Sequence, residues 1–357
     1  MFNTLHRLVE NFEKFPHRNA FFIRGRYHTY AAFELRIAAI CQQIIEEAGH
    51  DEQYLGIFTY DDIETYASVY ALWCLGRVYV PLNPTNPLKR NIEIIRQVGI
   101  RSLLSSNTAA VDSMFADAGA RIIDTSAADR KVDTLPAKRL EPLDVVDSDA
   151  DCYVLFTSGS TGKPKGVPIS RLNLDSYMQS FFGAGYELNE NDRFLQIYDL
   201  SFDASVRCFS IPLAVGGCMY TVPRDQIKYL YAYKLMKEHQ LTFVAMPPST
   251  LYYLQPYFSA IHLEQLRYCL LGGESFSSTM AERWAPCIPN AQIQNIYGPT
   301  EFTINSHIYN WQSALNEEKS CNGIVSIGRC IGDTMALVVD DNLMPLEENE
   351  KGELCLS

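Results

Sequence analysis

The stretch FTSGSTGKPKGV at residues 156–167 decides how this chain is interpreted. It holds three glycines, two lysines and four hydroxyl side chains, and it overlaps the end of the apolar run YVLF at 153–156. Glycine lets backbone amides turn toward a ligand, while hydroxyl and ammonium groups bind anions. The pattern therefore predicts a β-strand that runs into a phosphate-binding loop.

Two common phosphate-binding motifs do not match this stretch. In a Walker loop the lysine is followed by serine or threonine, but Lys163 is followed by Pro164, which has neither an amide hydrogen nor a hydroxyl. Gly159 and Gly162 are also too close together for the Walker spacing. The glycine pattern GxGxxG of dinucleotide-binding folds does not occur in the sequence.

Composition narrows the class of protein. The 357-residue chain has 42 acidic and 30 basic residues, a formal net charge of −12. Because it has no basic stripe to displace counterions from nucleic acid, we expect no nucleic-acid partner. The N-terminal stretch MFNTLHRLVENFEKF is too polar for a signal peptide, and the most apolar stretch, 66–75, is about half the length that spans a bilayer. We expect a cytoplasmic protein that does not bind membranes.

Strand-like and helix-like segments alternate along most of the chain. Residues 30–48 carry apolar side chains at helical spacing, and the apolar runs 243–246, 268–271 and 293–296 end 25 residues apart. This alternation predicts an α/β fold with mainly parallel sheets flanked by helices. Ligands bind where parallel strands end, so we expect the turns after these three runs and the loop at 156–167 to meet at one sheet edge.

The pattern changes near the C-terminus. Short apolar segments such as 336–339 and 353–356 alternate with turns, which predicts a small antiparallel sheet or barrel. We predict a first α/β subdomain at 1–152, a second α/β subdomain at 153–304 that carries the ATP and substrate motifs, and an incomplete β-barrel at 305–357.

Several motifs, in order, resemble those of the adenylate-forming superfamily, which includes acyl-CoA synthetases, luciferases and the adenylation domains of nonribosomal peptide synthetases. Along the chain they are VYVPLNPTNPLKR at 78–90, YVLFTSGSTGKPKGV at 153–167, LSFDAS at 200–205, LLGGE at 270–274, NIYGPTE at 295–301 and GELCLS at 352–357. The stretch at 153–167 is similar to the signature loop of the superfamily. The resemblance covers nearly the whole chain. It is closest to amino-acid adenylation domains and D-alanine–carrier-protein ligases.

The resemblance implies an AMP-forming acid–thiol ligase. Members of the superfamily join a carboxylate to the α-phosphate of ATP, release pyrophosphate and pass the acyl group to a thiol. ATP and Mg²⁺ are therefore the expected cofactors, and phosphopantetheine on a carrier protein is the expected acceptor. The alternatives are an acyl- or aryl-CoA ligase, and a non-catalytic module that binds nucleotide or docks a carrier protein.

The resemblance also assigns residues to the ATP site. The implied ATP-binding residues are Thr157, Ser158, Gly159, Ser160, Thr161, Gly162, Lys165, Gly272, Gly273, Glu274, Asn295, Tyr297, Gly298 and Thr300. Tyr297 is expected to stack on adenine and Asn295 to bind its exocyclic amine, while Gly272 and Gly273 let the backbone pass close to the ring. The implied catalytic residues are Thr157, Lys165, Thr300 and Glu301, with Glu301 as the magnesium ligand.

The substrate prediction depends on Asp203. In amino-acid-activating members an aspartate in this motif pairs with the α-ammonium group of the substrate, so we favour an amino acid. The implied side-chain pocket comprises Ala204, Arg207, Ala245, Leu270, Gly272, Ile296, Ile304 and Asn305. Arg207 is unexpected in such a pocket. It could bind an acidic or strongly polar side chain, shorten the pocket for a small substrate, or turn outward to solvent.

In the superfamily, the chain continues past the point that corresponds to Ser357. The continuation carries an aspartate that binds the ribose hydroxyls and a mobile lid whose lysine reaches the α-phosphate. We therefore expect this chain to be a truncated large N-terminal domain that lacks the C-terminal lid domain and adenylates poorly by itself.

Overall fold

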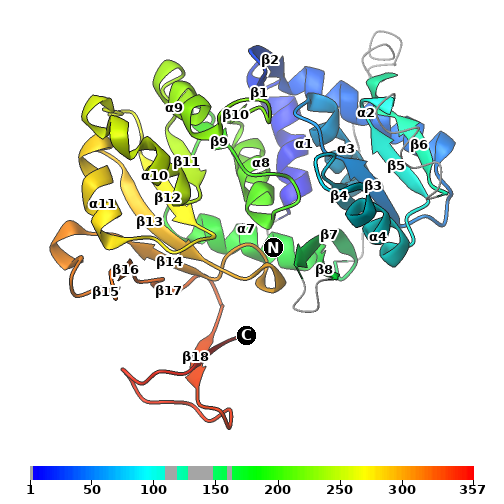
Figure 1. Cartoon of the computed structure of the whole chain (residues 1–357). Helices are drawn as coiled ribbons and strands as arrows, with labels where there is room; N and C mark the ends of the chain where they lie inside the picture. The colour runs from blue at the N-terminus through cyan, green and yellow to red at the C-terminus, as the bar shows by residue number, and fades with distance from the viewer. Residues whose placement is uncertain (1–2, 109–118, 128–147, 159–162) are drawn as a thin grey trace.

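The computed structural model describes residues 3–108, 119–127, 148–158 and 163–357. These residues form two large β-sheets that lie next to each other, with helices packed against both (Figure 1). Two further pairs of short strands belong to the C-terminal part of the chain.

The first sheet has six described strands in the order β6-β5-β3-β4-β7-β8. They are β3 (Tyr54–Phe58), β4 (Val78–Leu82), β5 (Ser102–Ser105), β6 (Arg121–Asp124), β7 (Asp151–Ser158) and β8 (Pro164–Ser170). The neighbours from β6 to β7 pair in parallel, whereas β8 runs antiparallel to β7 and forms a hairpin with it.

The second sheet has nine described strands in the order β17-β14-β13-β12-β11-β9-β10-β1-β2. They are β1 (Asn19–Ile23), β2 (Arg26–Thr29), β9 (Arg193–Gln196), β10 (Cys218–Thr221), β11 (Phe243–Met246), β12 (Tyr268–Gly272), β13 (Gln292–Tyr297), β14 (His307–Asn310) and β17 (Arg329–Cys330). The central strands from β13 to β1 are parallel, and antiparallel strands flank them on both sides.

A group of helices joins the two sheets. The described α-helices are α1 (Thr4–Lys14), α2 (Tyr30–Glu47), α3 (Ile63–Cys74), α4 (Leu88–Val98), α7 (Arg171–Gly183), α8 (Asp203–Val215), α9 (Lys228–Glu238), α10 (Ser249–Leu254) and α11 (Ser278–Trp284). Helices α1, α2, α3 and α8 contact one another between the sheets (Figure 1). Their side chains share one buried cluster with Phe21 of β1 and Ile57 of β3, so the two sheets have a common core.

Local sequence explains where the helices of this core begin and end. Thr29 caps α2 by accepting a hydrogen bond from the amide of Ala32, and α2 buries Phe33, Ile37 and Ile40 along one stripe. Helix α8 ends at Gly216, whose φ of +78° is a left-handed conformation that glycine adopts without steric cost. The helix predicted at 30–48 is confirmed.

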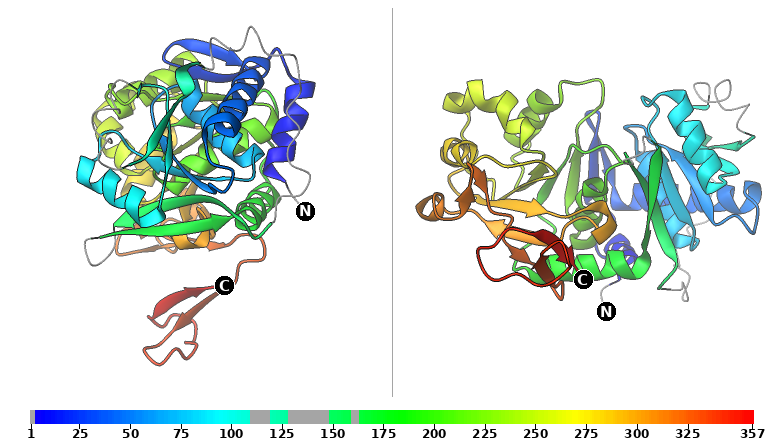
Figure 2. Two further views of the ribbon diagram at one scale, coloured as in Figure 1. Left: turned by 90° about the vertical axis from the view of Figure 1, so that its right-hand side faces the viewer. Right: turned by 60° about the horizontal axis from the view of Figure 1, so that its bottom comes forward.

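The predicted α/β class with mainly parallel sheets is confirmed. The three apolar runs that were expected to be consecutive strands are β11, β12 and β13, and they lie side by side in parallel. The two C-terminal segments form an antiparallel hairpin of β18 (Ala336–Val339) and β19 (Glu353–Leu356). Figure 2 shows this hairpin standing away from the two sheets.

The division into subdomains at 1–152, 153–304 and 305–357, with a β-barrel at the end, stays a prediction. The two large sheets are not divided at residue 152. The hairpin β7–β8 joins the first sheet through β4, whereas β1 and β2, near the N-terminus, join the second sheet through β10.

Among the described residues, no helix has both the length and the hydrophobicity to cross a bilayer. The cellular location stays a prediction.

Candidate active site

The described residues of the stretch 156–167 lie mainly in β7 and β8, which pair as an antiparallel hairpin. Thr157 lies near the end of β7 and pairs in register with Lys165 of β8, and Ser158 pairs with Pro164. The two strands therefore place Thr157 and Lys165 directly opposite each other. Four predicted ATP-binding residues lie outside the described part of the chain: Gly159, Ser160, Thr161 and Gly162.

The hairpin reaches across to the second sheet. Lys165 Nζ lies 3.6 Å from Glu301 Oε1, and Glu301 belongs to the short 3₁₀ helix η6 (Thr300–Phe302) that follows β13. We expected the hairpin loop and the turns after β11, β12 and β13 to share one sheet edge, and this was wrong in one respect. The hairpin belongs to the first sheet, and its Lys165 reaches Glu301, which follows β13 of the second sheet.

The end of β13 presents the predicted adenine-binding residues. Asn295 Nδ2 donates to the carbonyls of Val325 at 3.1 Å and Ser326 at 2.9 Å, which leaves the Asn295 side-chain oxygen available as an acceptor. An acceptor is what an exocyclic amine requires. Tyr297 is 38% exposed, so its side chain is accessible to a ligand that could stack on it.

Two consecutive glycines at the end of β12 differ in their surroundings. A Cβ on Gly272 would overlap Ile296, so glycine is needed there for packing between neighbouring strands. Gly273 has a φ of +83° and no atom near the position of its absent Cβ, so the backbone is open at this point. Glu274 accepts hydrogen bonds from the backbone amide of Ser249 at 2.9 Å and its hydroxyl at 3.1 Å, at the N-terminus of α10. The ATP contacts of these residues stay predictions.

Asp203 is the first residue of α8 and lies next to η6. Burial raises the pKa of its carboxyl group, while hydrogen bonding from Thr300 and from the Ala204 amide acts in the opposite direction. The negative charge of Glu301 adds to the upward shift. A carboxylate in the first turn of a helix is favoured by the helix dipole. The predicted ammonium-binding residue and the predicted magnesium ligand are thus neighbours.

The predicted side-chain pocket is a buried group drawn from several elements. Its buried members are Arg207 of α8, Ala245 of β11, Leu270 of β12, Ile296 of β13, and Ile304 and Asn305 after η6. Ala245 pairs with Leu270 and Gly272 with Ile296 across adjacent strands, while Ala204 is partly exposed beside Asp203. Arg207 is 1% exposed, so the possibility that it turns outward to solvent is wrong.

Three residues near the pocket were missed from the sequence. Tyr177 of α7 donates to Asn305 Oδ1 at 2.9 Å, and Arg207 Nη1 donates to the same oxygen at 3.2 Å. The phenols of Tyr186 and Tyr198 also lie close enough to interact with the Arg207 charge. No local motif marks these tyrosines, because they reach Arg207 only through tertiary packing.

A polar network that also escaped sequence reasoning links the two sheets near the site. Arg224, which follows β10, donates from Nη2 to Thr59 Oγ1 at 2.8 Å and from Nη1 to Asn83 Oδ1 at 3.2 Å. Its Nη2 also lies 3.0 Å from Asp199 Oδ2. Thr59 and Asn83 follow strands of the first sheet, and Asp199 follows β9 of the second. The network therefore fixes the strand ends of both sheets relative to each other.

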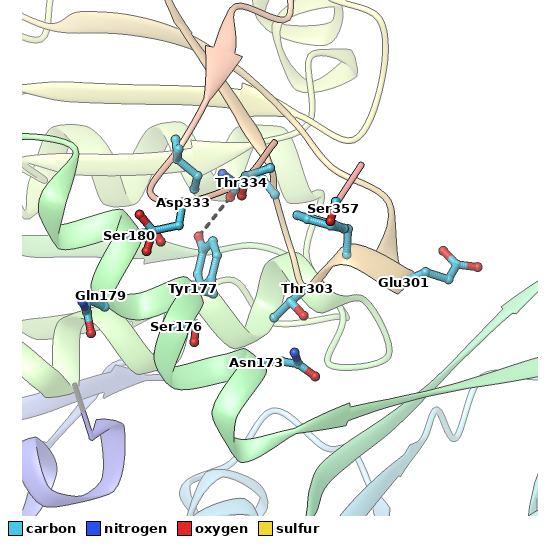
Figure 3. A pocket seen from close by; sticks show the side chains of 13 residues that line it. Asn173, Ser176, Tyr177, Gln179, Ser180, Glu301, Thr303, Asp333, Thr334 and Ser357 are labelled. Carbon is cyan, nitrogen blue, oxygen red and sulfur yellow. Dashed lines mark hydrogen bonds between the residues drawn. The ribbon is translucent and has the colours of Figure 1, made fainter. Parts of the chain in front are cut away.

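A cavity of about 520 Å³ adjoins the pocket. Its walls come from α7, from η6 and the residues after it, and from the segment before β18 (Figure 3). Tyr177, Glu301 and Asn305 line it, and Arg207 is connected to this lining through its hydrogen bond to Asn305 Oδ1. A volume of this order is typical of small-molecule sites.

Comparison with known proteins gives consistent matches. A family model described as AMP-binding enzyme matches residues 8–357. Tyrocidine synthase 1 of Brevibacillus parabrevis is 26% identical over 99% of this chain and 31% of its own length. The D-alanine–D-alanyl carrier protein ligase of Bacillus velezensis is 29% identical over 79% of this chain and 55% of its own length. The chain thus spans about a third and about half, respectively, of these curated relatives.

The fold matches solved structures as well. The N-terminal subdomain of Klebsiella oxytoca NpsA, solved in complex with 3-hydroxyanthranilyl-AMSN, gives a TM-score of 0.83 at 22% identity. The match covers 100% of this chain and 87% of the NpsA chain. It confirms the expected fold, that of an N-terminal adenylation subdomain. With the family model matching nearly every residue, the resemblance inferred from the motifs is confirmed: the chain belongs to the AMP-binding enzyme family.

Proposed function

We propose that this chain activates an amino acid with ATP, forming an aminoacyl-adenylate and releasing pyrophosphate, for transfer to the thiol of a phosphopantetheinyl carrier protein. One observation carries the proposal. The phosphate-loop hairpin and Glu301 face each other, with Lys165 Nζ 3.6 Å from Glu301 Oε1, and Asp203 lies beside Thr300 at the same place. Groups suited to phosphate, to a metal cation and to an ammonium ion therefore surround one space.

Charge is the main obstacle to this reaction. A carboxylate must approach the α-phosphate of ATP, and both groups are anionic, so positive charge and accurate positioning supply most of the rate enhancement. Lys165 and the hydroxyls of Thr157 and Ser158, near the end of β7 and the start of β8, would bind phosphate oxygens. The open acceptor of Asn295 and the exposed ring of Tyr297 would hold the adenine.

Glu301 fits the requirements of a magnesium ligand. Its side chain is 51% exposed and its ion-pair partner is the flexible Lys165 side chain, so the carboxylate can exchange that partner for a cation. Magnesium usually takes one or two carboxylates together with phosphate oxygens and water. When bound, Mg²⁺ would offset the negative charge shared by ATP and the attacking carboxylate.

Asp203 favours an amino acid over a simple carboxylic acid. A partly buried carboxylate whose neighbours include Glu301 gains most from a ligand that brings a positive charge, and an α-ammonium group does so. The carrier-protein acceptor is supported by the name of the D-alanine–D-alanyl carrier protein ligase, which is similar to this chain.

ATP–pyrophosphate exchange with the full-length gene product tests the proposal. The substrates are the twenty amino acids and matched carboxylic acids without an amine, such as acetate and benzoate. We expect exchange with an amino acid and at least about 100-fold lower kcat/KM for its deaminated counterpart. Equal rates with the deaminated acids would indicate an acyl- or aryl-activating enzyme. ATP binding without exchange for any acid would indicate a non-catalytic module.

A further inference from the structure

Arg207 is a buried cation that forms no ion pair within the described part of the chain. It is 1% exposed, and its Nη1 donates a hydrogen bond to Asn305 Oδ1 at 3.2 Å. Its Nε and Nη2 are buried and have no acceptor at hydrogen-bonding geometry, although the guanidinium group lies near enough to the Tyr177 and Tyr198 hydroxyls and the Cys208 thiol to interact with them. No carboxylate of the described residues forms an ion pair with it. Buried arginines are normally paired, because desolvation of an unpaired charge is costly.

The unpaired nitrogens form a specific edge. Arg77, Arg171 and Arg267 also have one buried unpaired nitrogen each, but these arginines are partly exposed. In Arg207 the unpaired pair is Nε with Nη2, two donors that point the same way. This edge of a guanidinium group matches the two oxygens of a carboxylate.

Asn305, which is hydrogen-bonded to Arg207, adds a third unmatched donor. Its Oδ1 accepts from both Tyr177 and Arg207, which fixes the orientation of the amide, and its Nδ2 is buried without an acceptor. The three unmatched nitrogens are therefore all donors. An ionised carboxylate is the common side-chain group that accepts at every position and donates at none.

The charge of Arg207 acts to lower the pKa of Asp203, a carboxylate that interacts with it from beyond ion-pair distance. The other groups around Arg207 include the phenols of Tyr177, Tyr186 and Tyr198 and the thiol of Cys208. Burial raises the pKa of each of these groups, so all of them stay neutral at physiological pH. An anionic ligand would supply the missing charge.

The position of Arg207 relates it to the substrate. It lies four residues after Asp203 on α8, so the two side chains are on the same face of the helix, one turn apart. Arginine side chains on helices lean toward the N-terminal end, which here is the Asp203 end. An amino acid whose α-ammonium group binds Asp203 would extend its side chain toward Arg207.

We propose that the amino acid activated by this chain carries a carboxylate on its side chain, held by Arg207 Nε and Nη2 and by Asn305 Nδ2. The inference rests on the proposed function, because it names the substrate class of the same site. Asn305 lines the cavity and accepts from Arg207, so the cavity borders the hydrogen-bonded group to which Arg207 belongs.

Isothermal titration calorimetry with non-reactive aminoacyl sulfamoyl-adenosines tests this inference on the full-length gene product. The probes are the glutamyl, glutaminyl, aspartyl and alanyl compounds. The glutamyl probe carries a side-chain carboxylate where the glutaminyl probe carries an amide. We expect an acidic probe to bind at least about 100-fold more tightly than the glutaminyl probe. Arg207→Met should remove this preference while the alanyl probe still binds.

The controls separate binding from folding. Because Met replaces a buried unpaired charge with an apolar chain of similar length, Arg207→Met should leave the midpoint of thermal unfolding unchanged or raise it. Arg171→Met removes another arginine with an unpaired nitrogen and should leave the acidic preference intact. Arg207→Lys keeps the charge without the two-nitrogen edge and should retain part of the preference.

Two outcomes would overturn the inference and leave the proposed function standing. In the first, the alanyl probe binds tightly and the glutamyl and aspartyl probes bind no more tightly than it does. This result would mean that Arg207 shortens the pocket for a small substrate. The other is an unchanged preference in Arg207→Met together with lower stability, which would make Arg207 a structural residue. Failure of every probe to bind would instead contradict the proposed function.

Discussion

The two halves of the candidate site hold their charges in opposite ways. The nucleotide half pairs Lys165 with Glu301, whose side chains are 66% and 51% exposed. The amino-acid half buries Arg207 and Asn305, at 1% and 5% exposure. An exposed pair exchanges partners at little cost, whereas a buried unpaired donor disfavours every ligand that does not match it. The exposed half is therefore suited to chemistry common to all substrates, and the buried half to discrimination.

Removing the charge of Asp203 should have the largest effect. In Asp203→Asn we expect kcat/KM for the amino acid in pyrophosphate exchange to fall about 1000-fold, or about 4 kcal/mol, because the ammonium group loses a partly buried counter-ion. Asp225→Asn is the control, since Asp225 forms an exposed ion pair with Arg24. If Asp203→Asn keeps full exchange activity, the charge of Asp203 is not needed to bind the substrate's ammonium group.

Glu301→Gln should have the next largest effect, from the exposed half. We expect kcat at saturating ATP and Mg²⁺ to fall about 100-fold, or about 2.7 kcal/mol, because an amide is a weaker ligand for a hard cation. The free energy of unfolding should hardly change, since the Lys165–Glu301 pair is exposed. Glu318→Gln, which removes an exposed partner of Lys319, serves as control. A kcat equal to that of the unmodified protein would exclude Glu301 as the metal ligand.

The contact between the two halves can be tested through Gly298. A Cβ at this position would overlap the backbone of Asn305, so Gly298→Ala should lower the free energy of unfolding by about 2 kcal/mol. Gly183→Ala is a matched control, because no atom lies near the position of its added Cβ and the backbone has a negative φ. Chemical denaturation measures both variants. Equal stability of the two would mean that the segment at 304–306 shifts easily.

The smallest effect is a dependence on pH. Burial raises the pKa of Asp203, so its carboxyl group begins to protonate at a higher pH than an ordinary aspartate. The ionised form is needed to pair with the ammonium group. Lowering the pH through the acidic range should therefore raise KM for the amino acid, because the protonated carboxyl group no longer pairs with the ammonium group. In Asp203→Asn, KM should show no such rise.

The same shift has an opposite consequence for folding. A raised pKa in the folded protein means that protonated Asp203 is favoured by folding, and this contribution to stability is lost as the pH rises through the folded pKa. Asp203→Asn should therefore not be less stable than the unmodified protein at neutral pH. Activity lost without stability lost would show that Asp203 serves binding and not folding.

Much of the fold was predictable because its signals are local. The helix at 30–47 shows an apolar stripe and a threonine cap, and the strands β11, β12 and β13 are short apolar runs followed by turns. The sheet memberships were not predictable in this way. Pairing of β1 with β10 joins segments far apart in the chain, and nothing near Phe21 indicates that its neighbour is Met219.

Some residues of the candidate site were likewise predictable from the sequence and others were not. Residues of the nucleotide half belong to contiguous motifs, so the sequence indicates them even where their contacts are untested. The hydrogen bonds from Tyr177 and Arg207 to Asn305, and those from Arg224 to Thr59 and Asn83, join side chains from separate elements. Such contacts depend on packing and leave no pattern in the sequence.

The sequence by itself determined the family, the fold class and the residue types that surround a nucleotide, because glycines, hydroxyls and charges at fixed spacing are needed wherever backbone must wrap a phosphate. Only the tertiary structure decided that the phosphate hairpin comes from one sheet and Glu301 from the other, and that Arg207 points inward. The physical reason is that burial and pairing depend on which distant segments come into contact. The type of a side chain does not determine whether its charge is solvated by water, paired with another group or left buried without a partner.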